Sequence, residues 1–464
     1  MGSMFQFDAD RRDRYLLFYL ISAPAFVDLI NGYAYFELGT GILGQAYRAS
    51  VLALLFLIMW RGVNRQLFFW LVGSGAVAAG IVFAILLKGQ SMHFSISLEV
   101  TKLLDILLYA FVLVILVTVP KPGIPQRAEQ IEKQLGLYGV YTAAILIVSY
   151  IADFGFPTYY SKATGQPYAF GFTGYYIANN TLSVVMLVPA AINLHRFQRD
   201  SSWTNLGFII LNIAGLIALG TRTGILGGVV MFVGLLAVVI LSKRIRSIMR
   251  TGALLMTIPA ALFAAVNIYQ YASQYSRAME RFVELSQLNV RSDHSSAAER
   301  YMAAQSNLDR LIGNGFSSYV GTFNAFINKQ DAVRATAEKD LVDIQASYGL
   351  VGLILFFSPM ILGLFASFWI FWVRGSLFHS HLFLAMTVLV THSVLAGHVL
   401  HQAKVTQMTG ALLALILLEL YRTRQAQQPQ ETVAWAGEPT GGLRPLRRPD
   451  PRSNPGPAGQ VPAE

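Results

Sequence analysis

Long apolar segments alternate with short polar ones along most of the chain. About twelve of the apolar segments approach the roughly 20 residues that an α-helix needs to cross a bilayer. They are expected near Tyr15–Phe36, Ala49–Arg61, Leu67–Lys88, Leu98–Val119, Leu137–Phe154, Tyr175–Leu194, Trp203–Gly220, Gly224–Leu241, Gly252–Gln270, Tyr348–Val373, Leu382–Leu400 and Val405–Tyr421. The pattern predicts an all-α polytopic membrane protein with about 12 transmembrane helices.

Lysine and arginine occur mainly in every second loop, and this bias predicts the direction of each span. The cation-rich loops contain Arg11, Arg12, Arg14, Arg61, Arg65, Lys121, Arg127, Lys133, Arg196, Arg199, Lys243, Arg244, Arg246, Arg250, Arg374, Arg422 and Arg424. The other loops contain few cations, namely Lys88, Lys162, Arg222 and Lys404. Because cytoplasmic loops are the ones enriched in lysine and arginine, both termini are expected to be cytoplasmic.

Two regions depart from the alternation. Residues 271–347 follow an odd number of spans and contain the helical pattern "AAERYMAAQSNLDRLIG", so they are expected to form a folded helical loop on the outer face. Residues 422–464 are rich in Pro, Gly, Gln and Arg, which predicts a disordered cytoplasmic tail. The expected organisation is a cytoplasmic N-terminus (1–14), nine spans (15–270), the outer loop (271–347), three spans (348–421) and the tail.

The composition indicates that lipid is the main solvent. Of 464 residues, 54% are hydrophobic and 13% are charged, whereas an average soluble protein has about 25% charged residues. This excludes a cytosolic enzyme, a secreted domain and a fibrous protein. The absence of cysteine excludes disulfides, thiolate metal sites and cysteine nucleophiles. The net charge of +10 follows mostly from the loop bias, so no nucleic-acid partner is expected.

Arg222 is the first candidate for chemistry. It lies in "LIALGTRTGILGG", where two apolar segments meet and Gly220 and Gly224 permit a break in the helix. A broken helix exposes backbone N–H groups that bind anions, and an arginine at membrane depth is costly unless it is paired or faces water. We therefore interpret Arg222 as functional. The alternative is a topological arginine that reaches toward the outer headgroups.

Arg300 is the second candidate, at the start of the helical pattern in the outer loop. The same loop contains Arg277, Arg281, Arg291, Arg310 and Arg334. Several outward-facing guanidinium groups above a lipid-embedded core suit an anionic ligand with a lipid tail, since the guanidinium fork pairs with phosphate oxygens. The alternative for each arginine is a solvated helical face, balanced by Glu280, Glu284, Glu299 and Asp309.

Carboxylates gather just before the tenth expected span, in "AEKDLVDIQASYGLVGLI". Glu338, Asp340 and Asp343 approach the membrane surface there, where partial burial could raise a carboxyl pKa toward the range of a general base. Asp340 and Asp343 are i,i+3 neighbours, and Tyr348 leads into the span as a candidate substrate contact. The alternative is a helix N-terminus that favours acidic residues through its dipole.

Polar residues elsewhere give weaker signals. Asn179 and Asn180 open the sixth expected span, where they could bind sugar hydroxyls or phosphate or could simply cap a helix. His392, His398 and His401 are expected on one helix, and a metal site needs more ligands than they offer. We expect neither a metal nor a cofactor.

Four stretches, in this order, resemble the O-antigen ligase and polymerase superfamily of bacterial surface-polysaccharide assembly. They are "FGFTGYYIANNTLSVVMLVPA", "GTRTG", "ERYMAAQSNLDRLIGNGFSSY" and "EKDLVDIQASYGLVGLI". Members of that superfamily resemble this chain in having about ten to fourteen spans and one large outer loop late in the chain. The resemblance covers roughly residues 168–353.

The resemblance implies a metal-independent glycosyltransferase of the bacterial inner membrane with a GT-C-like architecture. Such an enzyme moves a glycan from an undecaprenyl-pyrophosphate donor to an acceptor hydroxyl at the periplasmic face. Two arginines of the family clamp the pyrophosphate, and by position they resemble Arg222 and Arg300; Arg291 is a further candidate contact. Beyond the lipid-linked glycan and membrane lipid, a chain-length regulator or copolymerase is a candidate partner.

One position departs from the ligase pattern. Ligases of the superfamily have a histidine about eleven residues before the glycine that resembles Gly349, and here Glu338 occupies that position. Polymerases and exopolysaccharide relatives more often have acidic residues there, so the departure favours a polymerase, with Glu338 or Asp340 as the candidate general base or acceptor-orienting group. A ligase that transfers the glycan to lipid A-core is the alternative.

A flippase or secondary transporter is the alternative from another class. A transporter places charges near the midplane of both halves of the bundle, whereas this chain concentrates arginines and carboxylates in one outer loop. Three charges inside the fourth expected span, Glu99, Lys102 and Asp105, are interpreted as internal pairs at i,i+3 spacing.

Overall fold

The computed structural model describes residues 11, 13–60, 73, 80, 95–118, 124–158, 171–177, 179–242, 245, 247–255, 262, 265–266, 269, 287–326, 336–337, 339–374, 380–395, 397 and 399–427. The chain divides into two units, Met1–Thr423 and Arg424–Glu464. The first unit contains nearly all the described residues, and the following description concerns that unit. The expected tail falls almost entirely outside the described residues.

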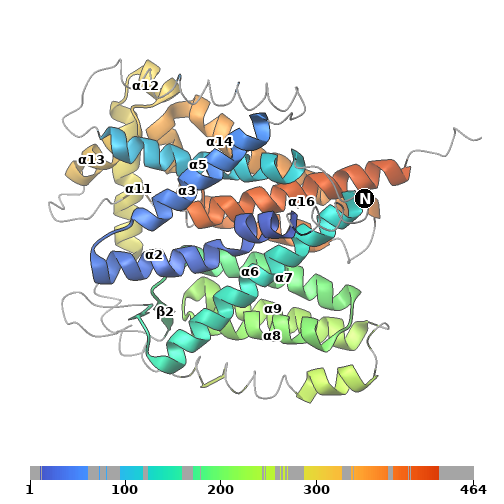
Figure 1. Cartoon of the computed structure of the whole chain (residues 1–464). Coiled ribbons are helices and arrows are strands. Elements are labelled where there is room, and N and C mark those ends of the chain that lie inside the picture. Colours follow the sequence, from blue (N-terminus) through green and yellow to red (C-terminus); the bar gives the residue numbers. More distant parts are fainter. Residues whose placement is uncertain are drawn as a thin grey trace, which may run out of the picture. The chain divides into compact units, whose positions relative to one another are not determined.

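Helices dominate the described part of the chain (Figure 1). After a short π-helix at Phe18–Ser22 they are α2 (Pro24–Leu38), α3 (Ile42–Trp60), α5 (Ile96–Thr118), α6 (Ile124–Ala152), α7 (Asn179–Arg199), α8 (Trp203–Ala218), α9 (Arg222–Leu241), α11 (Gln287–Ala304), α12 (Asn307–Ile312), α13 (Phe316–Phe326), α14 (Asp340–Arg374), α15 (Ser380–Leu395) and α16 (Ala403–Gln427). A small antiparallel hairpin of β1 (Phe156–Pro157) and β2 (Phe172–Gly174) lies between α6 and α7. The helical membrane architecture predicted from hydropathy is confirmed, with this hairpin as the exception.

Five helices among the described residues are long and apolar enough to cross a membrane, namely α5, α6, α9, α14 and α16. A sixth candidate arises if Asp13–Ser22 and Pro24–Leu38, which meet at a bend of 46°, form one broken span. Shorter apolar helices occur at Ile42–Leu55, in α8 and in α15. The expected spans at Leu67–Lys88 and Gly252–Gln270 lie largely outside the described residues, so the count of twelve stays a prediction.

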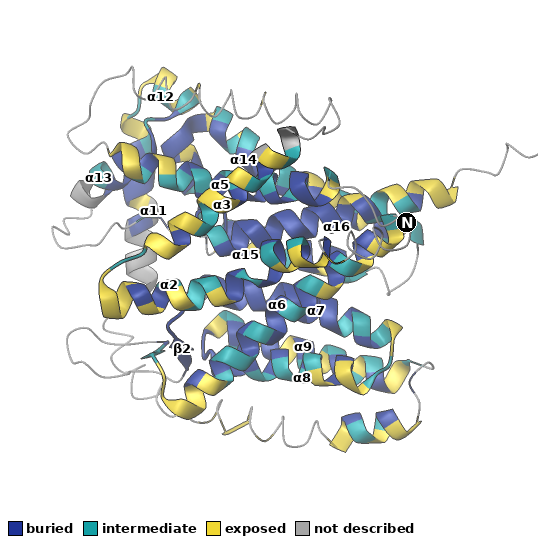
Figure 2. Ribbon diagram, in the orientation of Figure 1, coloured by how far each residue is buried: buried dark blue, intermediate teal, exposed yellow. Residues whose placement is uncertain are grey.

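Two apolar cores hold the bundle together. One joins residues of α5, α13, α14, α15 and α16, and the other joins residues of α7, α8 and α9. Helix α16 is buried along most of its length, at the centre of the first core (Figure 2). Because α6 packs against both α7 and α8 while α15 packs against both α7 and α14, the two cores are continuous with one another.

Ion pairs join helix ends that the charge bias assigns to one face of the membrane. Arg127, near the start of α6, bonds Asp13, and Arg374 at the end of α14 pairs with Glu419 of α16 at 3.2 Å. These ends all belong to the cation-rich loops of the sequence. The grouping agrees with the predicted alternation, and the assignment of this face to the cytoplasm stays a prediction.

Candidate functional site

Arg222 is the first residue of α9, directly after a break between α8 and α9. Gly220 has a φ of 69°, which a residue with a side chain adopts only under strain. The hydroxyl of Thr221 accepts a hydrogen bond from the backbone N–H of Gly224 at 2.9 Å and so caps the new helix. Buried Thr221 also bonds the Ser183 hydroxyl of α7, whereas the Arg222 side chain is exposed. The helix break predicted from the two glycines is present.

The β-hairpin supports this break from the other side. The Thr158 hydroxyl donates a hydrogen bond to the carbonyl of Leu219, the residue that ends α8. A Cβ on Gly171 would lie 2.4 Å from the same carbonyl oxygen, so only glycine allows the backbone to approach this closely. The glycine–aromatic stretch before α7 therefore packs against the chain just before Arg222 and supports the start of α9.

Arg300 lies on the exposed face of α11, and its Nε donates to the Ser296 carbonyl at 3.3 Å. The opposite face, with Ala297, Ala298 and Tyr301, is buried. Helix α11 packs on α13 and α14, whereas α9 packs on α7 and α8. The two arginines thus come from separate helix groups, and a shared ligand would have to reach both.

Helices α11, α12 and α13 form a cap that is joined to α14 by backbone contact. The N–H of Gly315 donates to the Ser347 carbonyl at 2.8 Å, and Gln305 donates to the Ala346 carbonyl at 3.1 Å. Gly349 interrupts α14 with a φ of 65° and a ψ of −168°. A Cβ on Gly349 would lie 2.5 Å from the Leu311 carbonyl. The backbone of residues 313–315 ("GNG") therefore packs directly against that of residues 347–349 ("SYG"). We call this contact the joint.

Asp343 is a buried acceptor beneath the cap. Its Oδ1 accepts from the Tyr319 hydroxyl at 2.8 Å and from the N–H of Ala337 at 2.9 Å. Burial and the neighbouring Asp343 carboxylate raise the pKa of Tyr319 well above its usual value. The phenol therefore stays protonated and donates its hydrogen to Asp343 Oδ1.

Asp340 is also fully buried, and its hydrogen bonds explain why. Its Oδ2 accepts from the Ser393 hydroxyl at 2.6 Å and from the N–H groups of Val399 and Leu400 at 2.8 and 3.2 Å. A carboxylate with these bonds anchors the loop after α15, and it is poorly placed to meet an incoming hydroxyl. Glu338, the other predicted base, lies outside the described residues.

The charges predicted in the fourth span take two different roles. Lys102 and Asp105 form the expected i,i+3 pair at 3.7 Å, and Arg48 of α3 pairs with Asp105 at 2.9 Å. Glu99 instead accepts from the N–H of Ser317 at 3.1 Å, so its carboxylate sits at the N-terminus of α13. Sequence reasoning missed this role because the partners lie 218 residues apart.

Tyr348, the predicted substrate contact, is fully buried and interacts electrostatically with Glu99. In this structure it belongs to the support of the cap and does not line an open surface. A small cavity of about 270 Å³ does open in the cap, lined by Met302, Ala303, Gln305, Arg310 and Gln345.

A chain of polar contacts links the hairpin to the cap. Lys404, at the start of α16, donates to the carbonyl of Ile177, three residues after β2 ends. Lys102, in the first part of α5, donates to the carbonyl of His401 at 3.2 Å, and α5 continues the chain through Glu99 to α13. The hairpin that contacts the break before Arg222 is thus linked, through the first turns of α16 and α5, to helix α13 of the cap. Figure 1 draws the hairpin and the cap helices at the same end of the bundle.

The remaining predicted residues are only partly described. Asn179 and Asn180 begin α7 and Arg291 lies in α11, but the side chains of all three fall outside the described part. The prediction that three histidines share one helix is wrong, because α15 ends at Leu395 and Gly397 turns the chain with a φ of 64°. His401 instead packs 5.0 Å from the Phe316 ring, between ring centroids.

Among the described residues, one group could hold a metal ion, formed by Glu132, His195 and His381. It lies on α6, α7 and α15, near the start of α6 where Asp13 bonds Arg127. It is thus separate from the Arg222 break. No model of a known protein family matches the chain, and no curated protein matches it.

Proposed function

We propose that the chain is a membrane glycosyltransferase that polymerises an undecaprenyl-pyrophosphate-linked glycan repeat at the periplasmic face of the bacterial inner membrane. The observation that carries the proposal is the Arg222 helix start. A glycine turn, a buried threonine cap and a hairpin all support it, and it belongs to the same end of the bundle as the cap that carries Arg300. A helix break whose only role was to connect α8 to α9 would not need these supporting contacts.

The chemistry follows from charge. An acceptor hydroxyl attacks the anomeric carbon of the donor, the bond from that carbon to the pyrophosphate oxygen breaks, and lipid pyrophosphate leaves. The guanidinium groups of Arg222 and Arg300 stabilise the negative charge that develops on the leaving group. Glu338 takes the proton of the attacking hydroxyl as general base. A GT-C-like architecture of about twelve spans, with both termini cytoplasmic, completes the proposal.

Transfer assays test the clamp directly. Purified full-length protein is incubated with an undecaprenyl-pyrophosphate-linked repeat, and products are resolved by gel. Arg222→Ala and Arg300→Ala are expected to lose at least about 100-fold in rate, as when a charge-stabilising donor is removed. Arg222→Lys should be only partly tolerated, because a point charge lacks the bidentate fork. The matched control is Arg14→Ala, which removes an exposed arginine near the N-terminus. Normal products from both alanine variants would eliminate the clamp.

The product separates polymerase from ligase. A ladder of long glycan on the lipid-pyrophosphate carrier indicates a polymerase, whereas transfer to lipid A-core indicates a ligase. A chain-length regulator that binds this protein would narrow the length distribution of the ladder. The same assay therefore tests the proposed partner.

A specific observation also favours a transporter or flippase as the second candidate. Arg48 of α3 and Lys102 of α5 both form ion pairs with Asp105 of α5, at 2.9 and 3.7 Å. Asp28 of α2 interacts electrostatically with Lys404 of α16 among the same apolar helices. Intramembrane charges of this kind often mark transport paths. If Lys404→Gln abolished movement of lipid-linked glycan across proteoliposomes while transfer activity was absent from the native protein, the transporter would replace the glycosyltransferase.

A further inference from the structure

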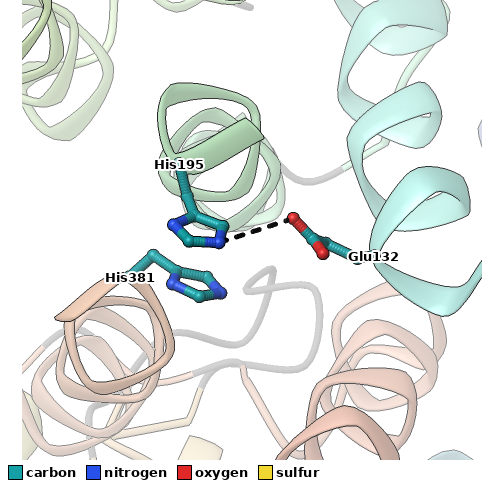
Figure 3. A group of neighbouring side chains, drawn as sticks. All are labelled: Glu132, His195 and His381. Atoms are coloured by element: carbon teal, nitrogen blue, oxygen red, sulfur yellow. Dashed lines mark ion pairs between the residues drawn. The ribbon is translucent and has the colours of Figure 1, made fainter. Parts of the chain in front are cut away.

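A buried cluster of two histidines and a glutamate joins three helices away from the Arg222 break. Glu132 lies on α6, His195 on α7 and His381 on α15, and Figure 3 shows the three side chains converging. Glu132 and His195 are both buried, and His381 is half-buried. Because α7 packs along both α6 and α15, the backbone holds the three side chains in place.

The distances between the histidine nitrogens and the glutamate oxygen can be compared with those of a hydrogen bond and of a metal site. Each residue offers one ligand atom, and these atoms all lie within 4.8 Å of one another. His195 Nε2 is 3.9 Å from Glu132 Oε1, which is too long for a hydrogen bond. Zinc bonds to histidine nitrogen and carboxylate oxygen would place such a pair from about 3.4 Å apart at a tetrahedral angle to about 4.2 Å at a straight one. The observed separation of 3.9 Å lies within this range.

The other oxygen of the carboxylate is already held. Glu132 Oε2 accepts from Arg199 Nη1 at 2.9 Å, which fixes the carboxylate and leaves Oε1 facing His195. A second interaction that orients a ligating carboxylate is usual around protein metal sites. Arg199 also pairs with exposed Glu129 at 3.8 Å, so a carboxylate besides Glu132 offsets its positive charge.

The two imidazole rings are stacked, with centroids 3.6 Å apart and planes 9° from parallel. Two rings in this arrangement cannot both direct an in-plane lone pair at one ion, so one ring must turn for both to coordinate. His381 is the less buried of the two, and the χ2 torsion of histidine is broad. The His381 ring is therefore the one expected to turn when an ion binds.

We propose that Glu132, His195 and His381 form a binding site for a zinc-type transition-metal ion that ties α6, α7 and α15 together. Two imidazole nitrogens and one carboxylate oxygen are the ligands that such ions prefer, whereas magnesium and calcium prefer oxygen alone. Three protein ligands leave a fourth position for water. The site concerns the packing of the helices, so it does not depend on the glycosyltransferase proposal.

Metal titration of the full-length protein tests the site. The purified chain, freed of any affinity tag and stripped with a chelator, is titrated with Zn²⁺ by calorimetry and with Co²⁺ by visible absorption. We expect one high-affinity ion per chain, a cobalt spectrum of histidine ligation, and a rise in the thermal midpoint with zinc. A chain that binds no zinc would overturn the proposal and leave only an ion pair between Glu132 and Arg199.

Variants identify the ligands. Glu132→Gln and His381→Gln are expected to weaken zinc binding by at least about 100-fold, since loss of an outer partner alone costs ~10–100-fold. Lys133→Gln, next to Glu132 on the same helix and exposed, is the matched control and should bind normally. His294→Gln, in the cap, controls for loss of any buried histidine. Unchanged zinc affinity in His381→Gln would overturn the site, and metal-free thermal midpoints show whether each variant is folded.

The outcome is independent of catalysis. If zinc binding is lost in Glu132→Gln while glycan transfer persists, the metal site and the glycosyltransferase both stand. If native protein binds zinc but Arg222→Ala still makes normal product, the clamp fails and the metal site stands. The two proposals can therefore fail separately.

Discussion

The backbone N–H of Gly315 donates a hydrogen bond to the carbonyl of Ser347 at 2.8 Å, and this bond joins the end of α12 to the break in α14. Around this bond the two segments of the chain are in backbone contact, since a Cβ on Gly313 would lie 2.1 Å from the Ser347 carbonyl oxygen. The joint ties the cap to the bundle. It also places Asp340 and Asp343, which begin α14, beneath the cap.

The joint predicts a large cost for any side chain at Gly313. Gly313→Ala adds a Cβ against backbone at a φ of 75°, so both strain and overlap oppose it. We expect a loss of at least about 2 kcal/mol, measured by thermal unfolding in detergent. The matched control is Gly207→Ala in α8, where nothing lies within 4 Å and φ is ordinary. Equal midpoints for the two variants would contradict the joint.

The cap of α9 gives a second prediction. Thr221→Val keeps the shape of the side chain but removes the acceptor for the N–H of Gly224 and the partner of Ser183. We expect a stability cost of about 1–2 kcal/mol and, because Arg222 begins the helix, a fall in glycan transfer. Ser202→Ala removes the equivalent cap from α8 and should cost about 1 kcal/mol without affecting transfer. If both variants affected transfer equally, the break would have no special role.

Features with local causes could be predicted from the sequence. The break before Arg222 follows from glycine and threonine around one position. The pattern expected to form one helix from Arg300 onward is instead divided between two helices, because α11 ends at Ala304 and Ser306 caps a new helix, α12. The apolar helices follow from hydropathy, although the number of spans that the described residues support is smaller than the expected count. In each case the physical cause lies within a few turns of the chain.

Features that depend on tertiary packing could not be predicted. Spacing alone suggested that Glu99 pairs within its own helix, yet its partner Ser317 belongs to α13. Asp340 accepts hydrogen bonds from Ser393 and Val399, more than 50 residues later in the chain, and its position in the sequence gives no sign of these partners. His195 was not recognised, because its partners come from two other helices and periodicity gives no information on such convergence.

The Tyr319–Asp343 hydrogen bond gives a third prediction. Tyr319→Phe and Asp343→Asn should each destabilise the protein by about 1–3 kcal/mol, since each leaves a buried polar group with fewer partners. In the double variant the costs should not add, with a coupling of about 1 kcal/mol or more, because the two residues share one bond. Thermal or denaturant unfolding of the four proteins measures the cycle. Tyr33→Phe, which alters an exposed tyrosine, is the control. Strict additivity would show that the bond contributes nothing.

Glu99 gives the last prediction, which separates its charge from its hydrogen bonds. Glu99→Gln keeps an acceptor for the N–H of Ser317 and removes only the charge at the start of α13, so we expect a loss of about 1 kcal/mol or less. Glu99→Leu leaves that buried N–H without an acceptor and should cost about 2–3 kcal/mol. Glu129→Gln, an exposed glutamate, should stay within about 0.5 kcal/mol of the native protein. Because Glu99 contacts the start of α13 in the cap, we expect transfer activity and the thermal midpoint to fall slightly in Glu99→Gln and further in Glu99→Leu. A Leu variant as stable as the Gln variant would mean that α13 does not depend on Glu99.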